Sequence, residues 1–309
     1  MDLVLGPSGS PVFDAVADVT EKHKMPMVAP SASTTSMYKK GRTFTFSMLS
    51  PAEVLLDGLL DLAAKKGLKT VALINRDDLG GRAVTQGAIE LAKKKGLQVV
   101  SADAYPEGTT DFSAILTKVR AANPDVLGGA THFEDAVAIT RQLKALNVNP
   151  RMVGLIGGVD LPKYYEVLGR DAEFAYGPTL WVPELVEVRA GGLIPIARQY
   201  PGAREFVESY RKEFPGAVVG GANGYGACQI LVEAIRRVGS LHREKLRDAI
   251  SKMDHDTVFG RFRVDRNGVQ IGHKMLLTQW QDGKRVIVWP EELAANQARF
   301  PTPPWNQRR

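Results

Sequence analysis

From residue 51 onward, apolar stretches with helical spacing alternate with short, continuously apolar stretches. The helical pattern occupies 51–67, 81–96, 111–122 and 134–146, and the strand pattern occupies 70–74, 97–103, 125–130 and 151–158. The first two helical stretches end in lysines followed by Gly67 and Gly96, which is typical of a helix C-terminus. Strands separated by helices of this length pair in parallel through right-handed crossovers. The rhythm therefore predicts an α/β fold on a mainly parallel sheet.

Two segments interrupt this rhythm and predict a second lobe. Residues 43–48 alternate polar and apolar side chains, and residues 175–183 contain two prolines. Beyond them come two amphipathic helical patterns without an intervening strand, and then a hairpin that turns at Asp282-Gly283. We expect two lobes assembled from discontinuous segments, with a proline-rich tail. The predicted ranges are 1–49 and 182–266 for lobe 1, 50–181 and 267–290 for lobe 2, and 291–309 for the tail.

The composition is that of a globular chain large enough for two domains. Of its 309 residues 44% are hydrophobic and 24% charged. Since no apolar run approaches the roughly 18 residues of a membrane span, direct membrane insertion is not expected. The formal charge of +6 comes partly from lysine clusters at predicted helix ends, so it does not predict nucleic-acid binding. The single cysteine, Cys228, lies on the apolar side of a predicted helix, where we expect a buried packing thiol.

Two predicted strands end in loops of small residues with hydroxyl groups. "LVLGPSGS" (3–10) and "MVAPSAS" (27–33) each pass from an apolar strand into proline and serine. In an open parallel sheet, ligands bind beyond the carboxyl ends of the strands. Hydroxyl and backbone N–H groups at that edge suit a carboxylate. Ser8, Ser10, Ser31, Ser33 and Thr34 are therefore candidate ligand residues, and helix capping is the alternative role for them.

Motifs of common enzymes are absent from the sequence. "GPSGS" (6–10) lacks the second glycine of a nucleophile elbow, and the five histidines show no metal-ligand spacing. "HFE" (132–134) is not followed by the P-C-x-x-C of zinc deaminases. There is no Walker loop, and "GGRAVTQG" (80–87) does not match a dinucleotide fingerprint. We expect a protein that is not an enzyme and that uses no metal or other cofactor.

Several long stretches resemble the type I periplasmic binding proteins, within them the leucine/isoleucine/valine-binding receptors of ABC transporters. The similar stretches are 2–34, 71–84, 111–127, 136–146 and 264–290, in the family's order. The resemblance implies two Rossmann-like lobes joined by three crossings that close on a small molecule. It also implies that the loop at Ser10 and the loop Ser31-Ala32-Ser33 hold the ligand's carboxylate, that an ABC permease is the partner, and that the full-length protein is periplasmic.

Departures from the family pattern bear on the ligand. Leu79 stands where amino-acid receptors place an aromatic ring, and Ile156 stands where they supply an acid for the ligand's ammonium. An unpaired ammonium in a closed cleft is costly. The departures favour an aromatic or aliphatic acid as the ligand over a branched-chain amino acid, unless another acidic side chain of the protein pairs with the ammonium group in place of residue 156. The residues open to that role are Asp160, Glu134 and Asp135.

Further residues are assigned to the ligand, and one alternative function stays open. Thr131 and His132 are expected beside Leu79 and Ile156 in lobe 2, with a surface or helix-capping role as the alternative for His132. Tyr225 and Trp181 are candidates for packing on the ligand, and packing in the core or at the hinge is the alternative for each. Family members carry further βα units before residue 2, so we expect an incomplete first lobe with an exposed strand edge and a tendency to associate. The alternative function is a cytoplasmic ligand-sensing regulator of the same fold.

Overall fold

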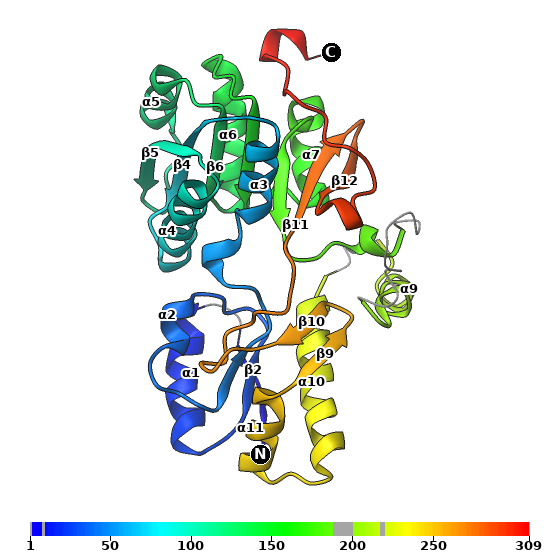
Figure 1. The fold of residues 1–309 in the computed structure, drawn as a ribbon. Coiled ribbons are helices and arrows are strands. Elements are labelled where there is room, and N and C mark those ends of the chain that lie inside the picture. The colour runs from blue at the N-terminus through cyan, green and yellow to red at the C-terminus, as the bar shows by residue number, and fades with distance from the viewer. Residues whose placement is uncertain (1, 8–9, 188–199, 217–219, 309) are drawn as a thin grey trace. The chain divides into compact units, whose positions relative to one another are not determined.

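The computed structural model describes residues 2–7, 10–187, 200–216 and 220–308, which fall into two compact units (Figure 1). Unit 1 comprises Met1–Ala52 and Leu180–Lys274, and unit 2 comprises Glu53–Thr179 and Met275–Arg309. The chain thus crosses between the units three times, as the resemblance implies. By packing, residues 267–274 belong to unit 1 and residues 291–309 to unit 2.

Unit 2 is built on a seven-stranded sheet in the order β12-β11-β8-β7-β6-β4-β5. The strands are β4 (Thr70–Arg76), β5 (Gln98–Tyr105), β6 (Val126–Ala130), β7 (Met152–Ile156), β8 (Tyr176–Thr179), β11 (Leu276–Gln281) and β12 (Lys284–Trp289). The five strands from β4 to β8 pair in parallel, and β11 runs antiparallel to both β8 and β12. The four strands predicted from the helix-strand rhythm are confirmed.

Helices cover this sheet. Three of them begin within two residues of the predicted starts, whereas the pattern predicted from residue 51 forms a 3-10 turn first and becomes α-helical only at Asp57. They are α3 (Asp57–Lys65), α4 (Leu79–Lys94), α5 (Ser113–Ala122), α6 (Phe133–Ala145) and α7 (Pro162–Leu168), with short 3-10 turns η1 (Ala52–Val54), η2 (Gly169–Ala172), η4 (Glu291–Leu293) and η5 (Trp305–Gln307). Helix α3 packs so closely on the sheet that a side-chain carbon on Gly154 would come 2.6 Å from Leu59 Cδ2. A larger residue at position 154 would therefore force the Leu59 side chain to move.

The last segment of the chain packs onto unit 2. The predicted hairpin joins β11 to β12, with Asp282 and Gly283 both at positive φ, +51° and +74°. Trp305 follows some twenty residues later and donates its indole N–H to the carbonyl oxygen of Val148 at 2.9 Å. Residues 291–308 are thus part of the folded unit rather than a detached tail.

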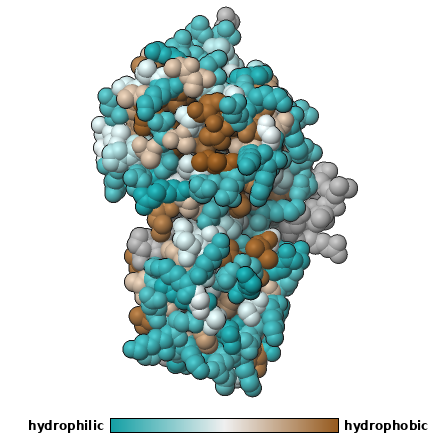
Figure 2. All heavy atoms as spheres, turned by 60° about the vertical axis from the view of Figure 1, so that its left-hand side comes forward, coloured by the Kyte–Doolittle hydropathy of each residue, from teal (hydrophilic) through white to brown (hydrophobic). Residues whose placement is uncertain are grey.

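Unit 1 contains a small parallel sheet in the order β1-β2-β3 and a separate hairpin. Its strands are β1 (Val4–Leu5), β2 (Met27–Ala29), β3 (Thr45–Ser47), β9 (Asp254–Thr257) and β10 (Gly260–Arg263). Its helices are α1 (Ser10–Lys22), α2 (Thr35–Tyr38), α9 (Ala203–Glu213), α10 (Ala222–Val238) and α11 (Arg243–Ser251), with the 3-10 turn η3 (Pro183–Glu187). Figure 2 shows mainly hydrophilic residues on the visible surface of each unit.

Two cores lie on the two faces of the β1-β2-β3 sheet. Val28 and Phe46 pack with residues of α10 and α11, whereas Met27 and Ala29 pack with Phe13 of α1. This alternation follows from the two-residue period of a strand. The prediction of a buried Cys228 is wrong: the residue lies in α10 but is exposed, because the buried face of that helix is made by its neighbours at 226–227, 230–231 and 234.

Candidate ligand-binding loops

The first candidate loop follows β2 and comprises Ser31, Ala32, Ser33 and Thr34, named here the hydroxyl loop. The hydroxyl of Ser31 accepts a hydrogen bond from Asn223 Nδ2 at 3.0 Å, and the same amide group donates to the carbonyl oxygen of Pro30 at 2.9 Å. Asn223 lies in the first turn of α10. It is a residue that the sequence reasoning missed, because 192 positions separate it from Ser31.

The backbone of the hydroxyl loop is held by buried groups. Ala32 is fully buried, and its carbonyl oxygen accepts from the Tyr38 hydroxyl at 2.8 Å and lies 3.1 Å from Ser47 Oγ. Burial raises the pKa of Tyr38, so this hydroxyl stays a donor. The carbonyl oxygen of Ser33 accepts from the N–H of Ala52 at 2.9 Å. The backbone at Ala32 is therefore fixed, and Ser31 and Ser33 on either side of it are partly exposed residues.

Thr34 carries a buried hydroxyl that has no hydrogen-bond partner among the described residues. The residue is 2% exposed, and although it stands at the N-cap of α2, its side chain makes no capping bond. A buried hydroxyl left without a partner costs about 1–3 kcal/mol. The described part of unit 1 therefore leaves this polar group in the predicted ligand loop unsatisfied.

Ser10 begins α1, directly after the loop that follows β1. Its side chain lies outside the described residues, and so does Ser8. Because β1, β2 and β3 are parallel neighbours, the loops after all three strands leave the sheet at the same edge. The sequence-predicted Ser10 and hydroxyl loop thus share that edge of unit 1.

The candidate residues of unit 2 follow three adjacent strands, β4, β6 and β7. The hydroxyl of Thr131 donates to the carbonyl oxygen of Ile156 at 2.8 Å, and its N–H donates to the same oxygen at 3.0 Å. Gly157 follows Ile156 with φ +92°. A side-chain carbon at position 157 would come 1.9 Å from the carbonyl oxygen of Thr131, so the two loops can approach this closely only with glycine there. The loops after β6 and β7 are therefore locked to one another.

His132 and Leu79 are brought together by Asp78, a second residue that the sequence reasoning missed. Asp78 caps α4, accepting from the N–H of Gly81 at 2.7 Å through Oδ1, while its Oδ2 lies 3.4 Å from His132 Nε2. Leu79 is the first residue of α4 and 40% exposed. The signal was present, since an aspartate just before a helical pattern is a common N-cap. This edge offers an imidazole beside apolar side chains.

Asp135 is already fully engaged within unit 2. Its Oδ2 accepts from Arg76 Nε at 3.1 Å, from the Tyr105 hydroxyl at 3.0 Å and from the N–H of His132 at 3.1 Å. The other acids considered for a ligand's ammonium differ in exposure, as Asp160 is partly buried and Glu134 is exposed. The Asp135 carboxylate supports the start of α6, and through it the position of His132.

Tyr225 lies apart from the bonds that hold the hydroxyl loop. It is 51% exposed, and its ring centroid lies 5.1 Å from that of Phe206 on α9. With Tyr210 and Phe214 these rings line a groove of about 360 Å³ between α9 and α10. Trp181 instead donates its indole N–H to the carbonyl oxygen of Val258 at 3.0 Å. Among the described residues, no cluster of three or more histidine, cysteine or acidic side chains is arranged to hold a metal ion.

A profile of the periplasmic binding protein family matches residues 1–285. Leu/Ile/Val-binding protein homolog 7 of Brucella abortus (strain 2308) is 28% identical over 244 residues, which are 76% of this chain and 58% of that protein. The chain thus spans less than two thirds of the length of that curated relative. Within the described residues, no helix is long and apolar enough to span a membrane.

The fold is similar to that of solved binding proteins. A leucine-binding protein from Thermotoga maritima MSB8 superimposes with a TM-score of 0.76 at 24% identity, covering 92% of this chain and 78% of that one. A solute-binding protein of an ABC transporter from R. palustris, solved in complex with benzoate, gives a TM-score of 0.73 at 17% identity, covering 93% and 76%. These likenesses identify the fold as that of type I periplasmic binding proteins.

Proposed function

Because the chain belongs to the periplasmic binding protein family, we propose that it is the solute-binding receptor of an ABC importer. The observation that carries the proposal is the buried, unpartnered hydroxyl of Thr34 in a loop that also presents Ser31 and Ser33. A carboxylate accepts several hydrogen bonds at once, which such a loop supplies. The ligand-bound receptor would deliver its solute to an ABC permease in the periplasm.

We infer further that the ligand is a small acid without an ammonium group. In this proposal the hydroxyl loop binds the carboxylate, while Leu79, Thr131, His132 and Ile156 of unit 2 select the rest of the ligand. Ile156 supplies no negative charge, and Asp135 is committed to Arg76 and Tyr105. Titration with leucine tests whether Asp160 or Glu134 pairs with an ammonium group instead. A benzoate complex of a protein with this fold supports an aromatic acid as one candidate. The leucine-binding neighbour makes leucine the comparison ligand.

Thr34 allows a sharp test, because valine has its shape without its hydroxyl. Calorimetric titrations with benzoate, isovalerate and leucine would measure affinity for the chain and for a Thr34→Val variant. We expect an acid without ammonium to bind the wild type. The variant should bind that acid at least tenfold more weakly, yet its melting temperature should be equal or higher because an unsatisfied buried hydroxyl has been removed.

Thr45 provides the matched control. It carries another buried hydroxyl of unit 1 that has no hydrogen-bond partner among the described residues, but it is the first residue of β3 and thus lies away from the edge where the loops emerge. Thr45→Val should preserve both stability and affinity. If none of the three acids binds, or if Thr34→Val binds as tightly as the wild type, the carboxylate role of the hydroxyl loop is rejected.

A further inference from the structure

The groove between α9 and α10 of unit 1 is lined by four aromatic rings. We name it the aromatic groove, and its rings are those of Phe206, Tyr210 and Phe214 on α9 and of Tyr225 on α10. The ring centroid of Phe206 lies 5.1 Å from that of Tyr225 and 6.0 Å from that of Tyr210, and Tyr210 and Phe214 are 5.0 Å apart. The planes of neighbouring rings meet at 50–53°, so the rings form a bent wall rather than a flat stack.

Two of these rings are more exposed than the packing of the helices requires. Tyr225 is 51% exposed and Phe214 is 49% exposed. Helix α9 already buries Ala203 and Val207, and α10 buries Ile230 with its neighbours on the same face. Clustered aromatic side chains that stay exposed are typical of a surface that binds another molecule.

The aromatic groove is acidic although the chain as a whole is basic. The formal charge of the chain is +6, yet Glu205 and Glu213 line the groove, and no lysine, arginine or histidine is among the described residues that line it. Positions 205, 209 and 213 repeat every four residues, so both carboxylates and Ser209 share one side of α9. Among the described residues, the side-chain cations that lie over aromatic rings use other rings than these four.

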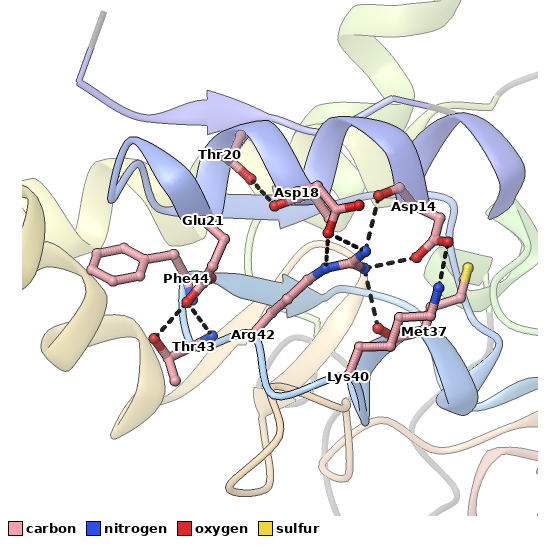
Figure 3. A network of polar contacts seen from close by, with 10 residues as sticks. Asp14, Asp18, Thr20, Glu21, Met37, Lys40, Arg42, Thr43 and Phe44 are labelled. Carbon is pink, nitrogen blue, oxygen red and sulfur yellow. Dashed lines mark hydrogen bonds and ion pairs between the residues drawn. The ribbon is translucent and has the colours of Figure 1, made fainter.

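Acids elsewhere in unit 1 have their charge balanced by the unit itself. On α1, the guanidinium of Arg42 donates to Asp14 at 2.7 Å and to Asp18 at 3.0 Å (Figure 3). In the described part of the chain, by contrast, neither Glu205 nor Glu213 is paired with a basic side chain. The negative charge of the aromatic groove is therefore available to a positively charged ligand.

We propose that the aromatic groove binds a small organic cation, a free alkylammonium whose charged group lies against the ring faces. Aromatic faces attract such a cation, and the two carboxylates add a Coulomb attraction. The groove volume of about 360 Å³ is that of a small-molecule site. Ser209 and Gln229 also line the groove, and their polar groups can bind a hydroxyl carried by the same ligand.

Choline and its neutral analogue 3,3-dimethylbutan-1-ol test this proposal, because the two molecules have the same shape and differ in charge. Ligand-observed NMR titrations on the whole chain, at low salt and without any acid ligand, measure both affinities. We expect choline to bind at least tenfold more tightly than the alcohol, since only choline carries the charge that the rings and carboxylates attract. If choline does not bind, or if the alcohol binds as tightly, the proposal is rejected.

Two variants locate the binding site. Tyr225→Leu keeps an apolar side chain but removes a ring face, and Glu205→Gln removes one charge at nearly constant shape. Each variant should bind choline at least fivefold more weakly than the wild type. Glu208→Gln is the matched control, since Glu208 is exposed on the same helix but does not line the groove, and it should bind choline within twofold of the wild type. Equal losses for Glu205→Gln and Glu208→Gln would attribute the binding to general surface charge and overturn the proposal.

Phosphatidylcholine carries the same trimethylammonium group on a membrane surface. Co-sedimentation with phosphatidylcholine vesicles distinguishes this source from the free cation, and we expect the chain to stay in the supernatant. Binding to vesicles without binding to free choline would overturn the proposal. Melting curves check that each variant is folded. None of these measurements uses a carboxylic acid, so their failure would leave the proposed transport function untouched.

Discussion

His273 accepts a hydrogen bond from Ser50, whose Oγ lies 3.1 Å from the imidazole Nδ1. On the other side of the ring, Nε2 lies 3.0 Å from the carbonyl oxygen of Phe259, which can only accept, so Nε2 carries the proton. The ring also stacks on Phe259 with centroids 4.7 Å apart. Ser50 and His273 stand just before the first and third crossings of the chain, and their bond ties those two segments together within unit 1.

Unit 1 should lose stability in mild acid because of this histidine. Burial lowers the pKa of His273 from 6.5 to about 4, so the folded chain keeps the ring neutral while the unfolded chain protonates it near 6.5. The neutral, buried ring therefore contributes fully to the free energy of unfolding above pH 6.5, and this contribution is lost as the pH falls toward 4. Between pH 8 and pH 5 the loss is about 2 kcal/mol. Urea unfolding at both pH values should show a smaller loss for His273→Gln, and equal losses would contradict this assignment.

Removing the Asn223 amide should loosen the hydroxyl loop. Asn223→Ala deletes the donor to Ser31 and Pro30, which should cost about 1 kcal/mol of folding free energy. Because Ser31 is then free to rotate, affinity for the acid that binds the wild type should fall roughly fivefold, in line with that energy. Calorimetry measures the affinity, and Asn306→Ala, at an exposed amide of unit 2, is the control. An unchanged affinity would separate Asn223 from ligand binding.

Breaking the Asp135 cluster should destabilise unit 2 strongly. Asp135→Leu leaves the guanidinium of Arg76, whose side chain is 15% exposed, without its buried partner, and such a break costs about 3–5 kcal/mol. The double variant Arg76→Met/Asp135→Leu should recover much of that loss, because no buried charge remains and Glu107, the other acid paired with Arg76, is 84% exposed. Chemical denaturation of the two single variants and the double variant measures the coupling. If the losses of the two single variants add up to the loss of the double variant, Arg76 and Asp135 are not coupled in stabilising unit 2.

An acid at position 156 should change the ligand preference. Ile156→Asp places a carboxylate after β7, where it can pair with an ammonium group. We expect affinity for leucine to rise and affinity for benzoate or isovalerate to fall, each about tenfold, since a charged hydrogen bond contributes roughly 1.5 kcal/mol or more. Ile271→Asp, at a 50% exposed isoleucine of unit 1, should change neither affinity. If Ile156→Asp also leaves both unchanged, Ile156 does not face the ligand.

Local sequence patterns predicted most of the secondary structure. Contacts between residues far apart in the sequence could not be predicted from it. The strand at 70–74 and the turn at Asp282-Gly283 follow from periodicity and from the φ angles that each residue tolerates. The bond between Asn223 and Ser31 joins residues 192 positions apart, and no spacing rule predicts it. Cys228 shows the limit of helical periodicity, since one step around α10 separates a buried position from an exposed one.

The order of the strands in unit 2 has a consequence for synthesis on the ribosome. Strand β11 pairs with β8, yet the whole second segment of unit 1 is translated between them. A nascent chain that has emerged as far as residue 270 therefore holds β4 to β8 with the edge of β8 open. That edge can close only after residues 276–281, which form β11, have emerged, so until then unit 2 holds a strand edge that can pair with another chain.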